Sequence, residues 1–248
     1  MKLNPNKMLC IAHRGESFDA PENTLSAFRL VAQSGADGIE CDIHLTGDGE
    51  IVCIHDADTR RTSDAYFKIA ETSFHELRKL DFGSWKDARW RGEKIPLLAE
   101  LFELVKPGMK VFIELKTAPS IVQVLKPVLQ KSALANDQII IISFDQETIA
   151  EAKKQLPHLK ACWLCAYDEN CHPSAEEIIA VLRRTGADGV DSHCADFIDA
   201  EFVRKIHDAG LEFHAWTIDE PEKVARFKAL GVDSITSNRA GYLKSIIY

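Results

Sequence analysis

Short β-type runs alternate with helical patterns along the chain, and this alternation limits the possible folds more than any other feature. Eight β-type runs occur, at residues 8–12, 38–42, 111–115, 138–142, 160–164, 187–190, 212–216 and 232–236. Helical patterns lie between most of them, at residues 24–34, 97–105, 120–131, 146–155, 175–184, 200–209 and 221–230. Such alternation is typical of a parallel sheet with crossover helices. Because 248 residues match one (β/α)8 TIM barrel, we predict a single α/β barrel domain over residues 1–248.

An additional β-type run at residues 51–54 does not fit this alternation. It follows the second predicted strand too closely for a crossover helix to lie between them. Glycines at positions 47 and 49 favour a hairpin turn. We therefore predict an antiparallel hairpin strand that returns His55 to the neighbourhood of Glu40.

The periodicity weakens between residues 56 and 96, where charged and aromatic residues occur without a clear strand. We interpret this stretch as a small inserted cap of short helices and loops on the catalytic face. An insertion of this length in a compact domain is usually functional or mobile.

Composition and charge exclude several classes of function. The formal charge of −8 argues against nucleic-acid binding, and no apolar run approaches the roughly 18 residues of a membrane span. We find no pattern of an export signal at the amino terminus. Seven cysteines without a regular framework indicate reduced thiols, so a cytoplasmic location is expected.

One cysteine cluster resembles half of a zinc site. Cys162 and Cys165 are followed by Cys171 and His172. Because residues three apart on a strand point to opposite faces, the first two should not bind one ion. We therefore predict no zinc site from this spacing.

Ionisable residues gather at the ends of the predicted strands. Side chains two positions apart on a strand share a face, as Glu40 and Asp42 do. Each acid alone could be a solvated charge, and each histidine a hydrogen-bonded core imidazole. Several carboxylates at one barrel mouth, however, would repel one another without a cation, and a hard divalent ion such as Mg²⁺ or Ca²⁺ suits oxygen ligands. The residues concerned are His13, Arg14, Glu40, Asp42, His55, Glu114 and Lys116.

Taken together, these motifs resemble the glycerophosphodiester phosphodiesterase family, in order and at similar spacing, from residue 10 to about 240. The resemblance implies metal-dependent hydrolysis of small glycerophosphodiesters to sn-glycerol 3-phosphate and an alcohol, a reaction of glycerol and lipid metabolism. The matching segments are His13-Arg14-Gly15, Pro21-Glu22-Asn23-Thr24, Glu40-x-Asp42, His55-Asp56, Glu114-x-Lys116 and Trp216-Thr217.

The resemblance also implies roles for individual residues. His13 and His55 would be the general base and acid. Glu40, Asp42 and Glu114 would hold one divalent cation, Mg²⁺ or Ca²⁺. The substrate would contact Arg14, Lys116 and Trp216. Glu22 and Asn23 would brace the site at the start of a helix.

The chain departs from the family pattern in two places. The stretch after Asp56 lacks the family's glycines, and the last predicted strand continues into Ser237-Asn238-Arg239, to which we assign no catalytic role. The sequence does not decide which alcohol leaves, which metal binds, or whether the reaction uses a cyclic intermediate or direct hydrolysis. A homo-oligomer is possible.

Two alternative functions use the same barrel. One is a lysophospholipase D-like or phosphoinositide-type phosphodiesterase, which should expose an apolar entrance around the aromatic residues of the insertion. The other is a non-catalytic barrel that binds phosphodiesters, whose expected mark would be a missing histidine or acid. The aromatic residues concerned are Phe67, Phe74, Phe82, Trp85 and Trp90.

Overall fold

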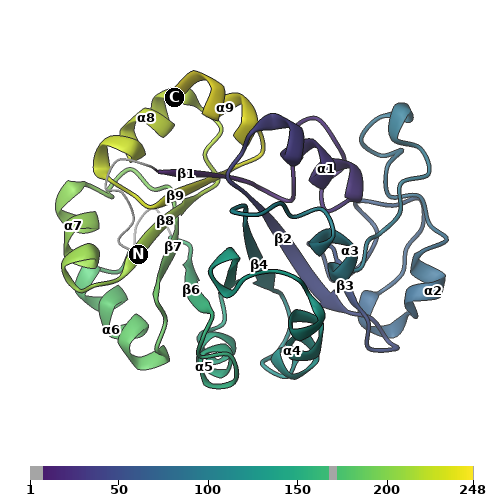
Figure 1. Cartoon of the computed structure of the whole chain (residues 1–248), viewed down its shortest axis with the longest axis horizontal. Coiled ribbons are helices and arrows are strands. Elements are labelled where there is room, and N and C mark those ends of the chain that lie inside the picture. The colour runs from purple at the N-terminus through teal and green to yellow at the C-terminus, as the bar shows by residue number, and fades with distance from the viewer. Residues whose placement is uncertain (1–7, 168–171, 248) are drawn as a thin grey trace.

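The computed structural model describes residues 8–167 and 172–247. Strands and helices alternate through most of this part of the chain (Figure 1). The strands are β1 (Leu9–Ala12), β2 (Gly38–Leu45), β3 (Ile51–Cys53), β4 (Lys110–Leu115), β5 (Ile139–Ser143), β6 (Lys160–Cys165), β7 (Gly189–His193), β8 (Glu212–Trp216) and β9 (Ser234–Ser237). The α-helices are α1 (Leu25–Ser34), α2 (Phe74–Leu77), α3 (Leu98–Phe102), α4 (Ile121–Lys131), α5 (Gln146–Gln155), α6 (Ala175–Thr185), α7 (Ala200–Asp208), α8 (Pro221–Leu230) and α9 (Ala240–Ile247). Three 3₁₀ helices are η1 (Ile69–Glu71), η2 (Ala88–Trp90) and η3 (Asn136–Gln138).

Eight parallel strands close into a barrel, as the sequence predicts. Within the described residues the strand order is β1-β9-β8-β7-β6-β5-β4-β2, and β1 also pairs with β2. Because every strand of the ring runs in the same direction, all eight carboxyl ends open on one rim. In the register of β2 and β4, Asp42 lies opposite Glu114, so charged residues from distant parts of the sequence meet there.

Strand β3 lies outside the ring, and the predicted hairpin is confirmed. It pairs antiparallel with the end of β2, which extends to Leu45, three residues beyond the predicted end. The backbone nitrogen of Ile54 donates to the carbonyl of Asp42 at 3.0 Å. This hydrogen bond fixes the position of His55, which follows directly.

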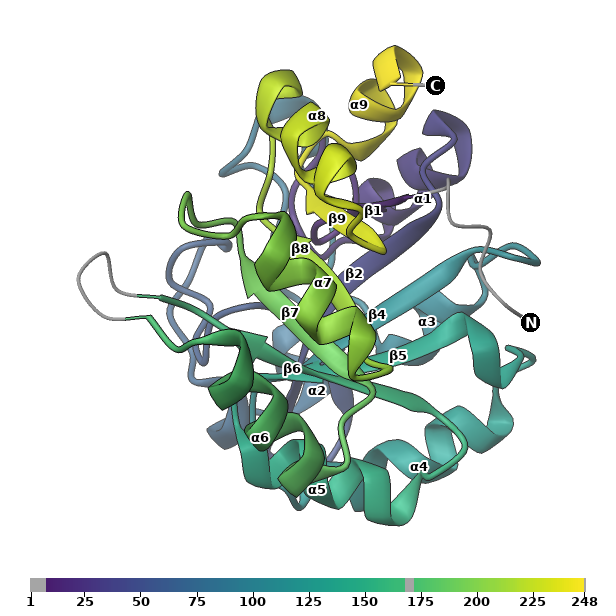
Figure 2. The same cartoon turned by 90° about the vertical axis from the view of Figure 1, so that its left-hand side faces the viewer.

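Two hydrophobic cores hold the barrel. The larger one lies between strands and helices, and Figure 2 shows α7 over the outside of β7 and β8. The smaller one fills the barrel with Ile11, Phe112, Ile140, Ile142, Cys162 and Leu164. Strands buried on both faces explain the continuous apolar run in β5. Each fully buried large side chain contributes roughly 1.5–3 kcal/mol through removal of apolar surface from water.

Helix ends follow the polar and glycine signals in the sequence. The Thr24 side chain accepts a hydrogen bond from the Ala27 nitrogen and caps α1, which ends at Gly35 with a φ of 81°. Glycine tolerates this left-handed conformation without a Cβ clash, so the chain turns directly into β2. Among the described residues, no helix combines the length and the apolar character that crossing a membrane requires.

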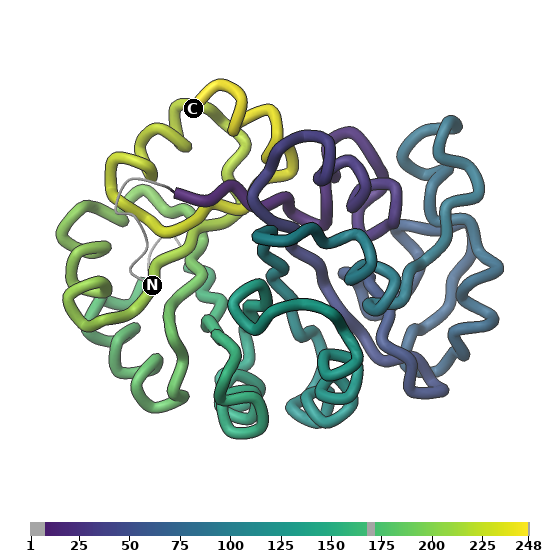
Figure 3. Tube along the Cα trace, viewed as in Figure 1, coloured from purple at the N-terminus to yellow at the C-terminus, as the bar shows by residue number. Residues whose placement is uncertain are grey.

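The inserted segment, residues 56–96, consists of short helices and loops, as predicted. It has its own small core, in which Phe82 packs with Ile69 and Leu77 against Val52 of β3. Figure 3 shows this segment at the flank of the barrel, next to β3 and α1. Lys86 and Arg89 donate to backbone carbonyls of the loop that follows β1, at 2.8 and 3.0 Å. The segment thus braces that loop from the side.

Candidate active site

Three buried carboxylates meet at the carboxyl rim of the barrel. Glu40 and Asp42 come from β2, and Glu114 comes from β4. Carboxylate oxygens of the three side chains lie within 4.8 Å of one another, and their exposed fractions are 3%, 0% and 7%. The acids that the sequence analysis grouped are therefore adjacent in space.

The charges of these acids are unequal because their neighbours differ. Burial acts to raise the pKa of Asp42, but Arg14 and Lys116 outweigh it and hold that pKa well below its usual range. Burial, reinforced by the Asp42 charge, raises the pKa of Glu114 to about 8. The same two causes raise the pKa of Glu40 well above its usual value. The cluster has more acid groups than its own cations can neutralise.

This donor set fits a divalent cation. Oδ1 of Asp42 is buried without a hydrogen bond of normal geometry, although Nζ of Lys116 lies 3.1 Å away. Lys116 also contacts Oε1 of Glu114 at 2.7 Å. Three carboxylates with an orphaned buried oxygen provide the hard ligands that Mg²⁺ and Ca²⁺ prefer.

His13 stands directly after β1, in a tight turn beside Glu40. Its Nε2 lies 4.0 Å from Oε2 of Glu40, and its Nδ1 lies 2.8 Å from Oδ1 of Asn238. Burial, followed by the Arg14 charge, lowers the pKa of His13 to about 4. The imidazole is therefore neutral at pH 7 and can accept a proton.

The turn after His13 requires unusual backbone conformations. Arg14 has a φ of 57° and Gly15 a φ of 80°, and a Cβ on Gly15 would lie 2.7 Å from backbone and side-chain atoms of Ala27. Left-handed conformations of non-glycine residues are often found at functional sites. Here the turn places the backbone nitrogen of Arg14 so that it donates to Oε2 of Glu40 at 2.8 Å.

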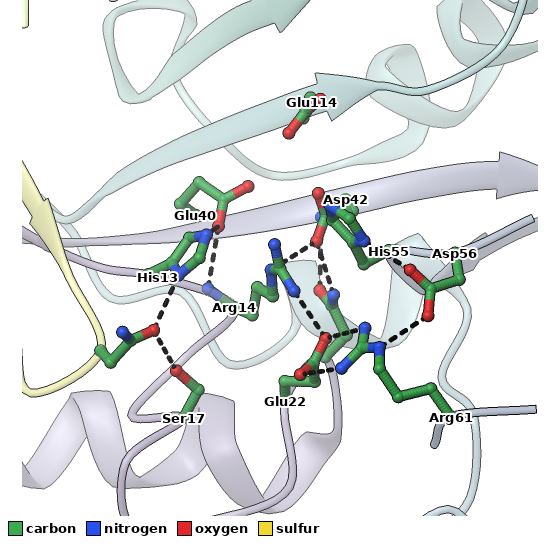
Figure 4. Close-up of polar contacts among 12 residues, drawn as sticks. His13, Arg14, Ser17, Glu22, Glu40, Asp42, His55, Asp56, Arg61 and Glu114 are labelled. Carbon is green, nitrogen blue, oxygen red and sulfur yellow. Dashed lines mark hydrogen bonds and ion pairs between the residues drawn. The ribbon is translucent and has the colours of Figure 1, made fainter. Parts of the chain in front are cut away.

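His55 reaches the same rim from β3. Its Nδ1 lies 2.7 Å from Oδ1 of Asp56, whose Oδ2 accepts from Nε of Arg61 at 2.7 Å. The Arg61 guanidinium also donates to both carboxylate oxygens of Glu22, at 2.7 and 2.8 Å. Glu22 in turn accepts from Nη1 of Arg14 at 2.8 Å. Figure 4 shows this chain of contacts linking both histidine turns.

Asn23 supports the acid cluster directly. Its side-chain nitrogen donates to Oδ2 of Asp42 at 2.8 Å, and its side-chain oxygen accepts from the Asp42 backbone nitrogen at 3.3 Å. Asn23 has a φ of 53°, a region that asparagine tolerates better than most residues. Together with the contacts of Glu22, this places the Pro21–Thr24 turn as a brace of the site.

A cavity of about 140 Å³ is lined by most of the site residues that the sequence predicts. Besides both histidines it is lined by apolar and aromatic side chains, and Phe144 packs edge-on against Trp216 with ring centroids 5.6 Å apart. Of the site residues predicted from the sequence, Asp42 alone does not line the cavity; its side chain is fully buried, 3.1 Å from Nζ of Lys116, which does line it. No residue of the inserted segment lines it among the described residues, and Asp56 and Arg61 connect that segment to His55 and Glu22.

The sequence analysis missed Asn238 and Asp191, and it gave no role to Phe144, which also lines the cavity. Asn238, to which it gave no role, contacts Nδ1 of His13, and Asp219 holds the Asn238 side chain at 2.6 Å. Asp191 from β7 lines the cavity with a buried oxygen, Oδ1, that lacks a hydrogen bond. Both follow the rule that polar residues at strand ends face the rim, which is the one signal that could have found them.

The fold and the site together define a barrel enzyme with a histidine and carboxylate centre at its carboxyl rim. Residues 13–242 match the model of the glycerophosphoryl diester phosphodiesterase family. The chain belongs to this family of enzymes.

Individual relatives extend over almost the whole chain. A glycerophosphodiester phosphodiesterase of Caldanaerobacter subterraneus subsp. tengcongensis is 34% identical over 94% of both chains. A phosphodiesterase of Oleispira antarctica, solved with the product sn-glycerol-3-phosphate, is 31% identical, with a TM-score of 0.87 over 96% of this chain and 95% of the other. The glycerophosphodiester phosphodiesterase of Thermotoga maritima is 24% identical, with a TM-score of 0.78 over 97% of this chain and 99% of the other, and supports the fold alone.

Proposed function

We propose that this chain hydrolyses glycerophosphodiesters to sn-glycerol 3-phosphate and an alcohol, using a divalent cation and two histidines that carry protons. The observation that carries the proposal is the convergence of His13, His55 and three buried acids on one rim of the barrel. The relative from Oleispira antarctica, with its bound product, supports the choice of substrate.

The cation would be held by Glu40, Asp42 and Glu114. When bound, it supplies Lewis-acid stabilisation of the charge that develops on the phosphoryl oxygens. Lys116 is already engaged by Asp42 and Glu114, so it would neutralise the acid side of the site. These are the residues whose oxygens lie close enough together to share one ion.

Arg14 would orient the phosphate. Its Nη1 donates to Glu22, and its Nε lies 3.1 Å from Oδ2 of Asp42. A guanidinium carries five N–H donors, so the remaining terminal nitrogen can bind a non-bridging oxygen. The contact with Glu22 holds the guanidinium plane in place before substrate arrives.

The two histidines have environments that suit opposite proton transfers. His13 is neutral at pH 7, because burial lowers its pKa to about 4, and it would accept the proton of the attacking hydroxyl. Its Nδ1 faces the Asn238 oxygen, so Nε2 is the accepting nitrogen. In His55, Nδ1 is hydrogen-bonded to Asp56, so Nε2 would protonate the leaving alkoxide. Each transfer contributes on the order of 10²–10⁴-fold to the rate.

Aromatic side chains would contact the organic part of the substrate. Trp216 and Phe144 line the cavity together with the charged residues, and Nε1 of Trp216 donates to the carbonyl of Asp191 at 3.0 Å. This hydrogen bond fixes the indole plane, which leaves its apolar surface for the carbon chain of glycerol.

A lipid substrate receives less support from the geometry. A lipid enzyme should have an apolar entrance formed by the aromatic residues of the inserted segment. Phe82 is buried at 4% exposure, and none of the five aromatic residues named in the sequence analysis lines the cavity. Exposed rings of the insertion, such as Phe67 and Trp85, lie on its own surface. Lysophospholipid micelles therefore serve as the discriminating substrate.

The proposed location is the cytoplasm. The six cysteines of the described residues are all free and buried. Reduced thiols of this kind are usual in a reducing compartment.

The test is a coupled assay of sn-glycerol 3-phosphate release from glycerophosphocholine, glycerophosphoethanolamine and glycerophosphoglycerol. We expect activity that EDTA abolishes and that Mg²⁺ or Ca²⁺ restores. His13→Ala and His55→Ala should each lose at least about 100-fold in kcat, with an unchanged circular-dichroism spectrum. His158→Ala, at an exposed histidine far from the rim, is the matched control. Full activity of either rim variant would exclude the proton-transfer roles, and faster release from lysophospholipids would favour the lipid alternative.

A further inference from the structure

A second cluster of potential metal ligands lies inside the barrel, separate from the active site. It consists of Cys162 of β6 with Glu212 and His214 of β8, and its ligand atoms lie within 4.8 Å of one another. None of the three side chains lines the active-site cavity. We propose that this cluster binds a zinc ion that links β6 to β8, the strands on either side of β7.

His214 is oriented as a metal ligand. Its Nδ1 lies 2.8 Å from Oγ of Ser234, and the Phe112 ring packs edge-on against the imidazole with centroids 5.4 Å apart. Its Nε2 is buried without a hydrogen bond of normal geometry, 3.4 Å from Oε2 of Glu212. A histidine that is anchored through one nitrogen and presents the other to a cluster has the arrangement that second-shell partners impose in metal sites.

The ligand set differs in kind from that of the active site. Thiolate, imidazole and carboxylate are the ligands of zinc, whereas Mg²⁺ and Ca²⁺ select oxygen alone. With zinc–ligand bonds of about 2.0–2.3 Å, tetrahedral ligands lie roughly 3.3–3.6 Å apart. The Nε2–Oε2 distance of 3.4 Å in the cluster falls in this range, and the sulfur of Cys162 lies within 4.8 Å of the other two ligand atoms.

The strands supply the ligands in an alternating pattern. Cys162 faces the inside of the barrel with Ile140 and Leu164, whereas Cys165, three residues later, faces the helices. This confirms the opposite orientation predicted for the two cysteines. The partners of Cys162 come instead from a strand two places along the ring, whereas Cys171 lies outside the described residues.

One ligand of the cluster, Glu212, forms an ion pair with Lys160. Nζ of Lys160 contacts Oε1 of Glu212 at the amino-terminal end of the barrel. The Lys160 side chain is 45% exposed, so it can move into solvent when the carboxylate turns to a metal. Binding is a ligand exchange without a redox change. The thiol proton of Cys162, and any proton on Nε2 of His214, pass to solvent as the metal bonds form.

Binding of Co²⁺, followed by absorption spectroscopy, distinguishes this site from the active site. We would load the metal-free protein with Co²⁺ in a large excess of Mg²⁺, which competes for the active-site acids. A cobalt–thiolate bond gives a near-ultraviolet charge-transfer band, and an oxygen-only site gives none. We expect one thiolate-bound cobalt per chain, displacement of the band by an equivalent of Zn²⁺, and release of at least one proton per ion.

Matched variants separate the two cysteines of β6. Cys162→Ser should lose the band and weaken zinc binding by more than the roughly 10- to 100-fold typical of losing an outer-shell partner. Cys165→Ser, on the opposite face of the same strand, should keep both. Glu212→Gln preserves the shape of the cluster if the serine variant fails to fold, and it should weaken zinc binding while retaining the band.

The outcome does not depend on catalysis, so it is distinguishable from a failure of the proposed function. A wild-type chain that develops no thiolate band and retains no zinc by elemental analysis would show that the cluster is an ion pair only. A band that survives in Cys162→Ser, or disappears in Cys165→Ser, would also overturn the proposal.

Discussion

Asp191 is expected to destabilise the folded chain at neutral pH. Its side chain is buried at 1% exposure, and burial raises its pKa to about 6, an effect that the charge of His214 only partly opposes. Ionising a carboxyl in this position therefore costs more in the folded state than in the unfolded chain. Asp191→Asn removes the ionisation and keeps the shape, so we predict a more stable protein above pH 6.

The sign and size of this stability change follow from the linkage between proton binding and folding. Because the folded chain holds the Asp191 proton more tightly than the unfolded chain, stability contributed by this group is complete below pH ~4 and is lost as the pH rises through 6. A shift from 3.8 to about 6 corresponds to a penalty of about 3 kcal/mol at pH 7.5 and roughly half of that at pH 5. The advantage of the variant should therefore shrink by roughly half between pH 7.5 and pH 5.

Urea unfolding of the metal-free parent and variant at several pH values measures this difference. Contributions of titratable groups that do not interact with Asp191 cancel in the comparison, since they are the same in the parent and the variant. Asp188→Asn is the control, because Asp188 accepts from Nζ of Lys153 at 2.7 Å and from the Ala161 nitrogen at 2.8 Å, and its loss should destabilise at pH 7.5. An Asp191→Asn variant whose stability difference from the parent does not vary with pH would refute the reasoning.

Three further predictions test other contacts. Asn238→Ala removes the partner of His13 Nδ1, so kcat should fall about 10- to 100-fold, less than the loss of the proton-transfer group itself, with little change in KM in steady-state assays. His207→Gln removes an imidazole whose pKa is raised by its hydrogen bond to Asp233. The stability it contributes is present below pH ~6.5 and is lost as the pH rises through the folded pKa, so urea unfolding should show a loss under about 1 kcal/mol at pH 5.5 and none at pH 9. Gly83→Ala would place a Cβ 1.8 Å from a backbone oxygen of the inserted segment, and limited proteolysis should cut that segment faster than in the parent.

The barrel and most of its site could be predicted because parallel strands share one rim. Each of Glu40, Glu114 and His13 stands at the end of an apolar run, and in a closed ring these ends must meet. The helix boundaries could be predicted for a different reason: a cap depends on residues close in sequence, such as Thr24 and Gly35 at the two ends of α1.

Contacts between distant strands could not be predicted in the same way. Asn238 meets His13 because β9 pairs with β1, and Cys162 meets His214 because of the combined register of three strands. A sequence pattern gives the face on which a residue lies, but not its height relative to other strands. The position of the inserted segment could not be predicted for another reason. It depends on side-chain contacts such as that of Lys86 with the Ser17 carbonyl, and such contacts leave no periodic pattern in the sequence.

The hydrogen bond between His13 and Asn238 spans 225 positions of the chain. During translation the histidine is therefore made 225 residues before its partner. A nascent polypeptide still lacking β9 would have every proposed metal ligand and both histidines, yet the first imidazole would be free to rotate. Full activity would then require that β9 has been made and has paired with β1.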